Sequence, residues 1–333
     1  MKVVDVHSHI VPDCFWKANA QDGNWYGASL FVRDGIQYIN AMNRVAGPID
    51  EKWQFTPEDR LAFMDQQGVD VHVLSVAPYL TNYHLEPGEG LASARELNDG
   101  TAEFASRRPD RFIGLATVPM QDTAAAAEEL ERSMQELGLA GVELNTNMEG
   151  HNWDEERFLP FFQAAERLGA FVFFHPHNPA GSDRATRYYL SNLINFPLDT
   201  TIAIASFIFG GVLDKCPDLK LCFAHGGGYA CFGIGRMDFG AGVRPEPKVN
   251  EIKDMPSDYL QRLYYDSITH SDEGLKYLVD RVGVDRVMLG DDFPFDMGPT
   301  DPVGWLKSLH HLNDYEKRRI LGENAQEVFG IEG

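Results

Sequence analysis

The chain has 333 residues, of which 44% are hydrophobic and 24% charged, an ordinary composition for a globular protein. Its 29 basic and 50 acidic residues leave a formal net charge of −21. Such a charge repels phosphate backbones and anionic membrane surfaces, so we expect neither nucleic acid nor a membrane as a partner. An anionic substrate would need arginines placed beside it.

The cysteines and the N-terminus indicate the compartment. Cys14, Cys216, Cys222 and Cys231 form no CxxC pair and are too few for a disulfide framework, so we expect reduced, mostly buried thiols. The first residues lack the basic segment and apolar region of a signal peptide. No uninterrupted apolar run approaches the roughly 18 residues that span a bilayer. We therefore expect a cytoplasmic protein.

Eight short, largely apolar runs alternate with longer segments along the chain. They are Val3–His7, Val69–Ser75, Phe112–Val118, Ala140–Leu144, Phe171–His175, Leu219–Ala224, Leu263–Ser267 and Arg286–Gly290. Continuously apolar strands separated by helices imply a parallel sheet buried on both faces. Eight such units favour an α/β fold with one (β/α)8 TIM barrel spanning 1–333. A doubly wound open sheet would need a glycine-rich turn after an early strand, and "HSHIVP" (7–12) is not one.

The segments between the strands predict helices and insertions. "AAAAEELERSMQEL" (124–137) and "LPFFQAAERL" (159–168) place apolar residues at helical spacing, and 316–329 predicts a closing helix. Residues 11–52 are rich in Trp, Tyr, Gly and Asn and have no clean period. We predict that they form a small N-terminal cap or insertion. A second surplus segment, 178–200, follows the fifth strand.

Polar residues end most of the predicted strands. They are His7 and His9 on the first, His175 and His177 on the fifth, His225 on the sixth, Asp266 on the seventh, and Asp291 and Asp292 on the eighth. Catalytic groups of a TIM barrel collect at this end of its strands. Because side chains alternate along a strand, His7 and His9 point to the same side. If Val4 and Val6 face the helices, both imidazoles face the barrel mouth.

A divalent metal would explain this set of residues. Three imidazoles and a carboxylate suit a borderline ion such as Zn²⁺, at distances of about 2.0–2.2 Å. We predict that His7, His9, His175 and Asp292 are the ligands and that a position remains for water. Mn²⁺ is an alternative, because this ligand set suits both ions. The other histidines predicted to be ordinary hydrogen-bonded residues are His72, His84, His151, His310 and His311.

The motifs resemble the amidohydrolase superfamily, whose mark is HxH followed by His, His and Asp on these strands. Within it, the chain is similar to the decarboxylase branch typified by 2-amino-3-carboxymuconate-6-semialdehyde decarboxylase. The resemblance covers nearly the whole chain. Its motifs include "VDVHSHIVP" (4–12), "FFHP" (173–176), "FAHGGG" (223–228), "GIGR" (233–236) and "LGDDFPF" (289–295). The last three are more specific than HxH alone.

The resemblance implies roles for further residues. The same four ligands would hold the metal, with no organic cofactor. His225 matches a catalytic histidine that activates metal-bound water, with Asp292 beside it. Arg236 matches an arginine that reaches the neighbouring subunit's site and holds a substrate carboxylate, which implies a homodimer. Phe295 matches an aromatic residue that lines the pocket, and His177 stands among the substrate-binding positions.

Several positions depart from the branch. Ile39 stands where it has a second substrate arginine, and Asn192 lies near the position of a pocket tryptophan. His177 replaces another tryptophan, and Asp291 replaces Thr or Ser. These changes surround the substrate rather than the metal. The metal chemistry is therefore expected to be kept, while the substrate can differ.

The resemblance predicts a metal-dependent, non-oxidative decarboxylase of a small carboxylated aromatic or muconate-semialdehyde-type acid. The alternative is a metal-dependent hydrolase of a small ester, lactone, amide or C–C bond, because the ligands alone do not discriminate the two. Glu143 could bridge a second metal, although a hydrogen-bonded barrel glutamate is favoured. A non-enzymatic barrel with a structural metal is disfavoured by the complete ligand set and by His225. Aromatic residues, among them Trp25, Tyr26 and Tyr188, are candidate pocket residues.

Overall fold

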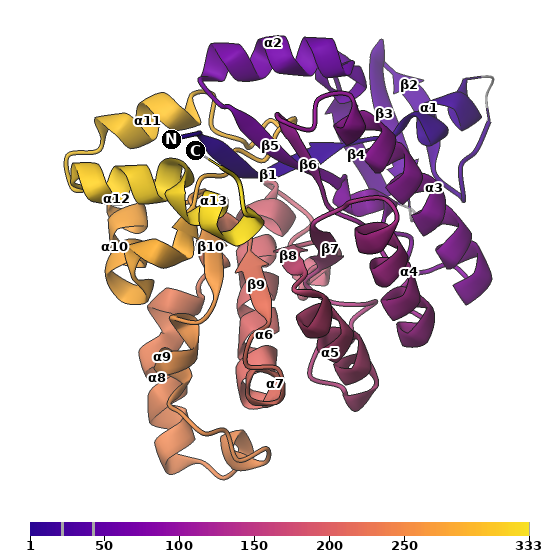
Figure 1. The fold of residues 1–333 in the computed structure, drawn as a ribbon. Helices are drawn as coiled ribbons and strands as arrows, with labels where there is room; N and C mark the ends of the chain where they lie inside the picture. The colour runs from indigo at the N-terminus through magenta and orange to yellow at the C-terminus, as the bar shows by residue number, and fades with distance from the viewer. Residues whose placement is uncertain (21–22, 42–43, 333) are drawn as a thin grey trace.

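Eight parallel strands form a closed barrel in the computed structural model, which describes residues 1–20, 23–41 and 44–332 (Figure 1). The strands are β1 (Val4–Ile10), β5 (Val71–Val76), β6 (Phe112–Gly114), β7 (Gly141–Asn145), β8 (Phe171–His175), β9 (Lys220–Phe223), β10 (Tyr264–Asp266) and β11 (Val287–Met288). They pair in the orders β1-β5-β6 and β7-β8-β9-β10-β11. A parallel bridge between Ala116 and Val142 joins one junction. The bond from Val6 N to Leu289 O (2.9 Å) closes the other. The predicted (β/α)8 barrel is confirmed.

Helices cover the outside of the barrel (Figure 1). They are α2 (Pro57–Gln67), α3 (Pro87–Ser106), α4 (Thr123–Gln135), α5 (Leu159–Leu168), α6 (Phe196–Phe209), α7 (Val212–Lys215), α8 (Ala230–Val243), α9 (Pro256–Leu260), α10 (Asp272–Val282), α11 (Pro302–Ser308), α12 (Asp314–Arg318) and α13 (Asn324–Phe329). The helices predicted over 124–137 and 159–168 are α4 and α5. The closing helix contains a π-helical turn, Arg319–Glu323, between α12 and α13.

Local sequence explains where several helices begin and end. Thr56 and Asp59 form a capping box that satisfies backbone N–H groups at the start of α2. Gly68 and Gly169 end α2 and α5 with φ of 71° and 67°. Glycine adopts this left-handed conformation without a steric penalty, so each helix stops where the chain must turn back toward the barrel.

Strand β1 contains an irregularity that changes which side chains face inward. Its pairing with β5 shifts register between Asp5 and Ser8. Val4 and Val6 therefore lie in the buried cluster that contains Phe173. The ring of His7 also contacts Phe173, at 4.8 Å between ring centroids. The expectation that Val4 and Val6 face the helices is wrong, because the register shift lets them and the following histidine face the interior together.

Residues 11–52 contain a helix and a small antiparallel sheet. The elements are α1 (Asp13–Asn19), β2 (Ser29–Arg33), β3 (Ile36–Ala41) and β4 (Arg44–Ile49). The hairpin β2–β3 turns through Asp34 and Gly35, whose φ values are 54° and 77°. Asp-Gly is a strong hairpin signal, so the sequence contained evidence for this sheet that the absence of a clean period obscured. That the segment acts as a cap stays a prediction.

This insertion has its own hydrophobic core. Phe15, Trp25, Ile39 and Trp53 pack there, together with Tyr79 from the barrel. The indole of Trp25 donates to Glu96 on α3 at 2.9 Å. Trp25 therefore attaches the insertion to the barrel and is not a pocket residue.

One helical stretch of the described chain, Ser191–Phe209, is long and apolar enough to cross a membrane by length and composition alone. It joins the π-helical turn η5 (Ser191–Asn195) to α6. The expectation from uninterrupted apolar runs did not include it. The stretch contains Asp199, which is buried and accepts hydrogen bonds from the side chain of Asn147 (2.8 Å) and the backbone of Ala180 (2.9 Å). These contacts anchor it to the barrel.

Gly290, two residues after β11, packs closely against β1 and β10, which carry His7 and Asp266. A Cβ atom there would lie 2.9 Å from His7 Cβ and 3.0 Å from Asp266 Cβ. Both neighbours belong to fixed strands, so we expect Gly290→Ala to lower the free energy of unfolding by about 1–3 kcal/mol, measured by urea denaturation. Gly88→Ala is the control, since its Cβ would meet nothing within 4 Å. Equal stability of the two variants would contradict this packing.

Candidate metal centre and adjoining cavities

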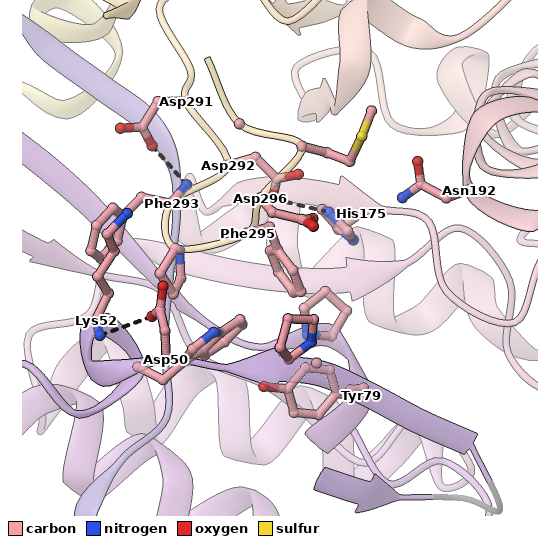
Figure 2. A pocket seen from close by; sticks show the side chains of 18 of the residues that line it. Asp50, Lys52, Tyr79, His175, Asn192, Asp291, Asp292, Phe293, Phe295 and Asp296 are labelled. Atoms are coloured by element: carbon pink, nitrogen blue, oxygen red, sulfur yellow. Dashed lines mark hydrogen bonds and ion pairs between the residues drawn. The ribbon is translucent and has the colours of Figure 1, made fainter. Parts of the chain in front are cut away.

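Three imidazoles converge on one carboxylate oxygen at the C-terminal ends of the strands. The Nε2 atoms of His7, His9 and His175 lie 3.1, 3.2 and 3.6 Å from Asp292 Oδ1. The Nε2 atoms of His7 and His9 are 3.1 Å apart. Figure 2 shows His175 and Asp292 directed toward one another across this point. The structure thus brings together all four predicted ligands.

The opposite nitrogen of each ring has an acceptor or partner. Nδ1 of His7 lies 2.6 Å from an oxygen of Asp266, Nδ1 of His9 lies 3.2 Å from Ser75 Oγ, and Nδ1 of His175 lies 3.1 Å from the Pro176 carbonyl. A proton on each Nδ1 leaves a lone pair on each Nε2. All three lone pairs then face Asp292 Oδ1, which is itself an acceptor.

This donor set fits a divalent cation. Four acceptors that face one another at 3.1–3.6 Å repel unless a positive charge lies between them. Ligands about 2.1 Å from a tetrahedral ion are roughly 3.4 Å apart, which matches these separations. Neither Asp292 Oδ1 nor His175 Nε2 has a hydrogen-bond partner among the residues that the structure describes. The chemistry and spacing of the four groups therefore suit a bound metal ion.

Charge is concentrated at the same point. Burial disfavours the ionised form of Asp292, but the neighbouring histidines, His7 above all, outweigh it and hold the pKa of this carboxyl well below its usual range. Burial likewise opposes the charge of His7. The carboxylates of Asp292 and Asp266 overcome that effect and, without a bound ion, raise the pKa of His7 well above its usual value, so that a proton on Nε2 would take the place of the cation.

Asp266 at the end of β10 supports the centre from behind. Besides His7 Nδ1, it accepts the backbone N–H groups of His225 (2.9 Å), Gly226 (2.8 Å) and Ile268 (3.0 Å). Burial raises the pKa of Asp266, but these contacts, above all with His7, lower it overall, so the residue is ionised. The sequence placed Asp266 at a strand end without revealing this role, because its partners are distant along the chain.

His225 lies beside the four ligands. Its Nε2 atom is 3.4 Å from Asp292 Oδ2, the oxygen that faces away from the other imidazoles. His225 and Asp292 both have left-handed backbones, with φ of 56° and 58°. Such conformations are costly for residues other than glycine and cluster at functional sites. The glycines that follow have a local reason, since a Cβ at Gly228 would lie 2.1 Å from the Pro197 carbonyl oxygen.

Glu143 on β7 faces the barrel interior, as predicted. One of its oxygens is 3.5 Å from His9 Nδ1, on the side of the ring that points away from Asp292. Its position beside this nitrogen suits support of His9 rather than a bridge between two metals. Burial raises the pKa of Glu143 to about 8.

Two cavities meet at the candidate metal centre. The larger, about 620 Å³, is lined by His175, Asp292 and aromatic residues that include Trp53 and Phe295 (Figure 2). The smaller, about 480 Å³, is lined by His225 and Asp292 and extends along α8. Four residues line both cavities: Asn192, Phe196, Asp292 and Met297. A small molecule could therefore approach the centre from either side.

The predicted substrate-binding residues separate into two groups. His177 and Phe295 line the larger cavity. Arg236 is exposed on α8 and is not among the described residues that line either cavity. Lys52 is the one lysine or arginine among the described lining residues of the larger cavity. Tyr188, a candidate pocket residue, is 73% exposed.

Comparison with known proteins places this chain in a family. The sequence pattern of the family described as "Amidohydrolase" matches residues 4–331. The chain belongs to the amidohydrolase family. The 2-amino-3-carboxymuconate-6-semialdehyde decarboxylase of Dictyostelium discoideum is 38% identical to this amidohydrolase over 336 residues, covering 99% of this chain and 92% of that protein. The family and the branch predicted from the motifs are confirmed.

Solved structures of two decarboxylases share the fold. The 5-carboxyvanillate decarboxylase of Sphingomonas paucimobilis superposes with a TM-score of 0.83 at 25% identity, over 99% of each chain. The dihydroxybenzoic acid decarboxylase of Polaromonas sp. JS666, solved with manganese and the inhibitor 2-nitroresorcinol, gives a TM-score of 0.80 at 23% identity. That match covers 99% of this amidohydrolase and 97% of the other chain.

The raised pKa of Glu143 predicts how the stability of the metal-free protein depends on pH. A carboxyl whose pKa rises from 4.5 unfolded to about 8 folded binds more protons in the folded state between these values. Its contribution is therefore largest at low pH and is lost as pH rises toward 8, at up to about 1.4 kcal/mol per pH unit. We expect Glu143→Gln to remove this part of the slope in urea denaturation between pH 5 and 8.

The matched control for this measurement is Glu128→Gln, which changes a solvent-exposed glutamate and should keep the wild-type slope. Comparing each variant with the wild type separates the contribution of Glu143 to the slope of stability against pH from the contributions of other titratable groups. Parallel stability curves for Glu143→Gln and the wild type would show that Glu143 is ionised in the folded protein.

Proposed function

We propose that this amidohydrolase is a metal-dependent, non-oxidative decarboxylase of a small carboxylated aromatic or muconate-semialdehyde-type acid. The observation that carries the proposal is the meeting of three imidazole Nε2 atoms at Asp292 Oδ1, with His225 on the other carboxylate oxygen. The relatives named above are decarboxylases of such acids. Zn²⁺ is the ion we propose, with Mn²⁺ as the alternative, and no organic cofactor is required.

The chain's residues divide the work as follows. His7, His9, His175 and Asp292 hold the ion, which when bound acts as a Lewis acid and lowers the pKa of water. Phe295 and the other aromatic side chains of the larger cavity present flat apolar surfaces to a planar substrate.

His225 and Asp292 are placed to move a proton, because Nε2 and Oδ2 are 3.4 Å apart and both residues line the smaller cavity. In the proposed reaction a proton reaches the unsaturated substrate carbon that carries the carboxylate. That carbon keeps the electron pair of the breaking C–C bond, and the carboxylate leaves as CO₂. No oxidant or reductant is consumed.

We further propose a homodimer formed by the outer face of α6 and α8. Large apolar side chains are exposed there: Leu193, Ile194, Leu198, Tyr229, Phe232, Phe239 and Val243. The two elements lie side by side, since Tyr229 N donates to Thr201 Oγ1 at 2.8 Å. Contiguous exposed apolar surface of this kind marks an association site. Phe232 belongs both to this face and to the lining of the smaller cavity, so a partner seated here would lie beside the site.

Arg236 fits this arrangement. It is exposed on α8, four residues after Phe232 and three before Phe239, so it lies on the same side of the helix as these exposed side chains. In a twofold dimer the same surface of both subunits meets, so the Arg236 of each chain could reach the other chain's smaller cavity. An arginine supplied in this way would hold a substrate carboxylate that the described lining of that cavity leaves without a cationic partner. A cytoplasmic location is also proposed, from the reduced thiols expected above.

The proposed reaction is tested by CO₂ release. The protein is stripped with a chelator, reloaded with Zn²⁺ or Mn²⁺, and offered 2,6-dihydroxybenzoate, 5-carboxyvanillate and an aromatic ester or lactone. We expect CO₂ and the decarboxylated arene from at least one acid, with loss of activity on chelation. His225→Ala should lower kcat by about 10²–10⁴-fold, because it removes a proton-transfer group, while metal content is unchanged.

His151→Ala, which removes an exposed histidine paired with Glu155, is the matched control and should keep full activity. Ester or lactone opening without CO₂ would replace the decarboxylase with the hydrolase alternative. Full activity after exhaustive metal removal would contradict both.

The role of Arg236 is tested by mixing two inactive subunits. Arg236→Ala and His225→Ala chains, carrying different tags, are co-expressed, and the mixed dimers are isolated. Each mixed dimer has one site with an intact His225 and an intact partner Arg236, so the isolated mixed dimers should show about half of the wild-type activity per chain. Mixed dimers that stay inactive, or a wild-type protein that sediments as a monomer, would contradict this arrangement.

A further inference from the structure

A second buried polar cluster lies directly behind the metal centre, and the proposed reaction does not use it. It contains Asp5, Arg60, His72 and Asp291, each no more than 4% exposed. Side-chain atoms of Asp5, His72 and Asp291 lie within 4.8 Å of one another. Asp5 Oδ2 and His72 Nε2 are 3.7 Å apart, and neither has a hydrogen-bond partner in the described structure. A group this polar and this deeply buried requires an explanation.

Arg60 connects this cluster to the backbone of the metal centre. Its Nη1 donates to the carbonyl oxygen of His9 at 2.7 Å, and its Nε donates to His72 Nδ1 at 3.2 Å. The guanidinium also stacks on the ring of Phe293, with its carbon 4.3 Å from the ring centroid. One side chain from α2 thus contacts a ligand on β1 and the residue that follows the ligand Asp292.

The two carboxylates contact the same two segments. Asp5 Oδ1 accepts the backbone N–H of His7 at 2.8 Å. Asp291 Oδ1 accepts the backbone N–H of Phe293 at 2.8 Å, a contact visible in Figure 2. The segments also bond directly, from Asp292 N to the His7 carbonyl at 2.8 Å. The backbone of β1 and of the turn after β11 is therefore held at several points around the ligands.

Charge explains why an arginine occupies this place. Asp5, His72 and Asp291 are spaced like a cation site, and Arg60 supplies a cation to it. Burial lowers the pKa of Arg60 to about 10, and the two carboxylates oppose that effect, so the guanidinium is charged at neutral pH. A buried arginine that donates two hydrogen bonds and stacks on an aromatic ring can fix geometry that an isolated charge could not. A second metal ion would have to share the cluster with this fixed positive charge.

We propose that Arg60 is a positioning residue for the metal centre. It fixes the position of the His9 carbonyl relative to Phe293. As a result, the imidazoles of β1 and the carboxylate of Asp292 lie at bonding distance from one ion. The inference rests on the metal centre proposed above. It predicts a residue whose loss loosens the metal without removing any ligand.

The test compares Arg60→Met and Arg60→Lys with Arg132→Met in the full-length protein. Arg132 is a suitable control because it is partly buried and donates to the buried carboxylate of Glu129 at 2.8 Å, on the outer helix α4. The Zn²⁺ dissociation constant is measured by competition with a fluorescent chelator. The visible spectrum of the Co²⁺-substituted protein reports the ligand geometry directly.

We expect Arg60→Met to raise the dissociation constant about 10–100-fold and to shift the Co²⁺ bands, as loss of a group that orients the ligands does. Arg60→Lys keeps the charge but not the fork of donors, so its effect should be smaller but in the same direction. Arg132→Met should lower the unfolding temperature and leave both metal readouts unchanged. If Arg60→Met does not fold, the Lys variant decides by the same two readouts.

Two results would overturn the proposal. One is a folded Arg60 variant with wild-type affinity and Co²⁺ spectrum. The other is a content of two metal ions per wild-type chain with the second lost in His72→Gln, which would make the cluster a metal site. A wild-type protein that binds no divalent ion would instead refute the metal centre itself, so the two failures are distinguishable.

Discussion

The carboxylate of Asp266 is the group on which the centre depends most. It fixes the tautomer of His7 through a 2.6 Å contact and holds the backbone of His225 at the same time. One ionised side chain thus orients a ligand and the proposed proton-transfer residue from behind, where substrate does not reach. The field of this buried charge also favours a cation in front of His7. Asp266 therefore connects His7 on β1 to His225 in the loop after β9 through both hydrogen bonds and charge.

The barrel and the four ligands could be predicted because they depend on local patterns. Continuous apolar runs mark buried strands, and polar residues at their ends must meet once the barrel closes. The inward side of β1 could not be predicted, since one register shift near Asp5 changes which side chains share a face. The contacts of Arg60 were equally hidden. Its partners, from His9 to Phe293, are scattered along the chain, and no local pattern links them.

The two cavities, rather than the candidate metal ligands, determine how a substrate carboxylate can be bound. Both reach Asp292, but one is lined in part by β4 of the insertion and the residues after it, and the other runs along α8. With Lys52 as the single lysine or arginine in the described lining of the larger cavity, the strongly acidic protein offers a carboxylate little attraction from within one chain. Association of two chains through α8 would supply the missing positive charge. In the proposed dimer, substrate binding would therefore depend on the association of two chains.

The hydrophobic core that residues 11–52 share with one side of the barrel has an evolutionary consequence. Its hairpin packs around Phe15 and Trp25, while β4 and the segment that follows it line the larger cavity. The insertion thus supplies part of the wall of the larger cavity, while His175 and Asp292 line the same cavity from the barrel. Mutations in the hairpin can accumulate without disturbing the ligands. New substrates can be recruited by exchanging this small module, while the barrel preserves one chemistry beneath it.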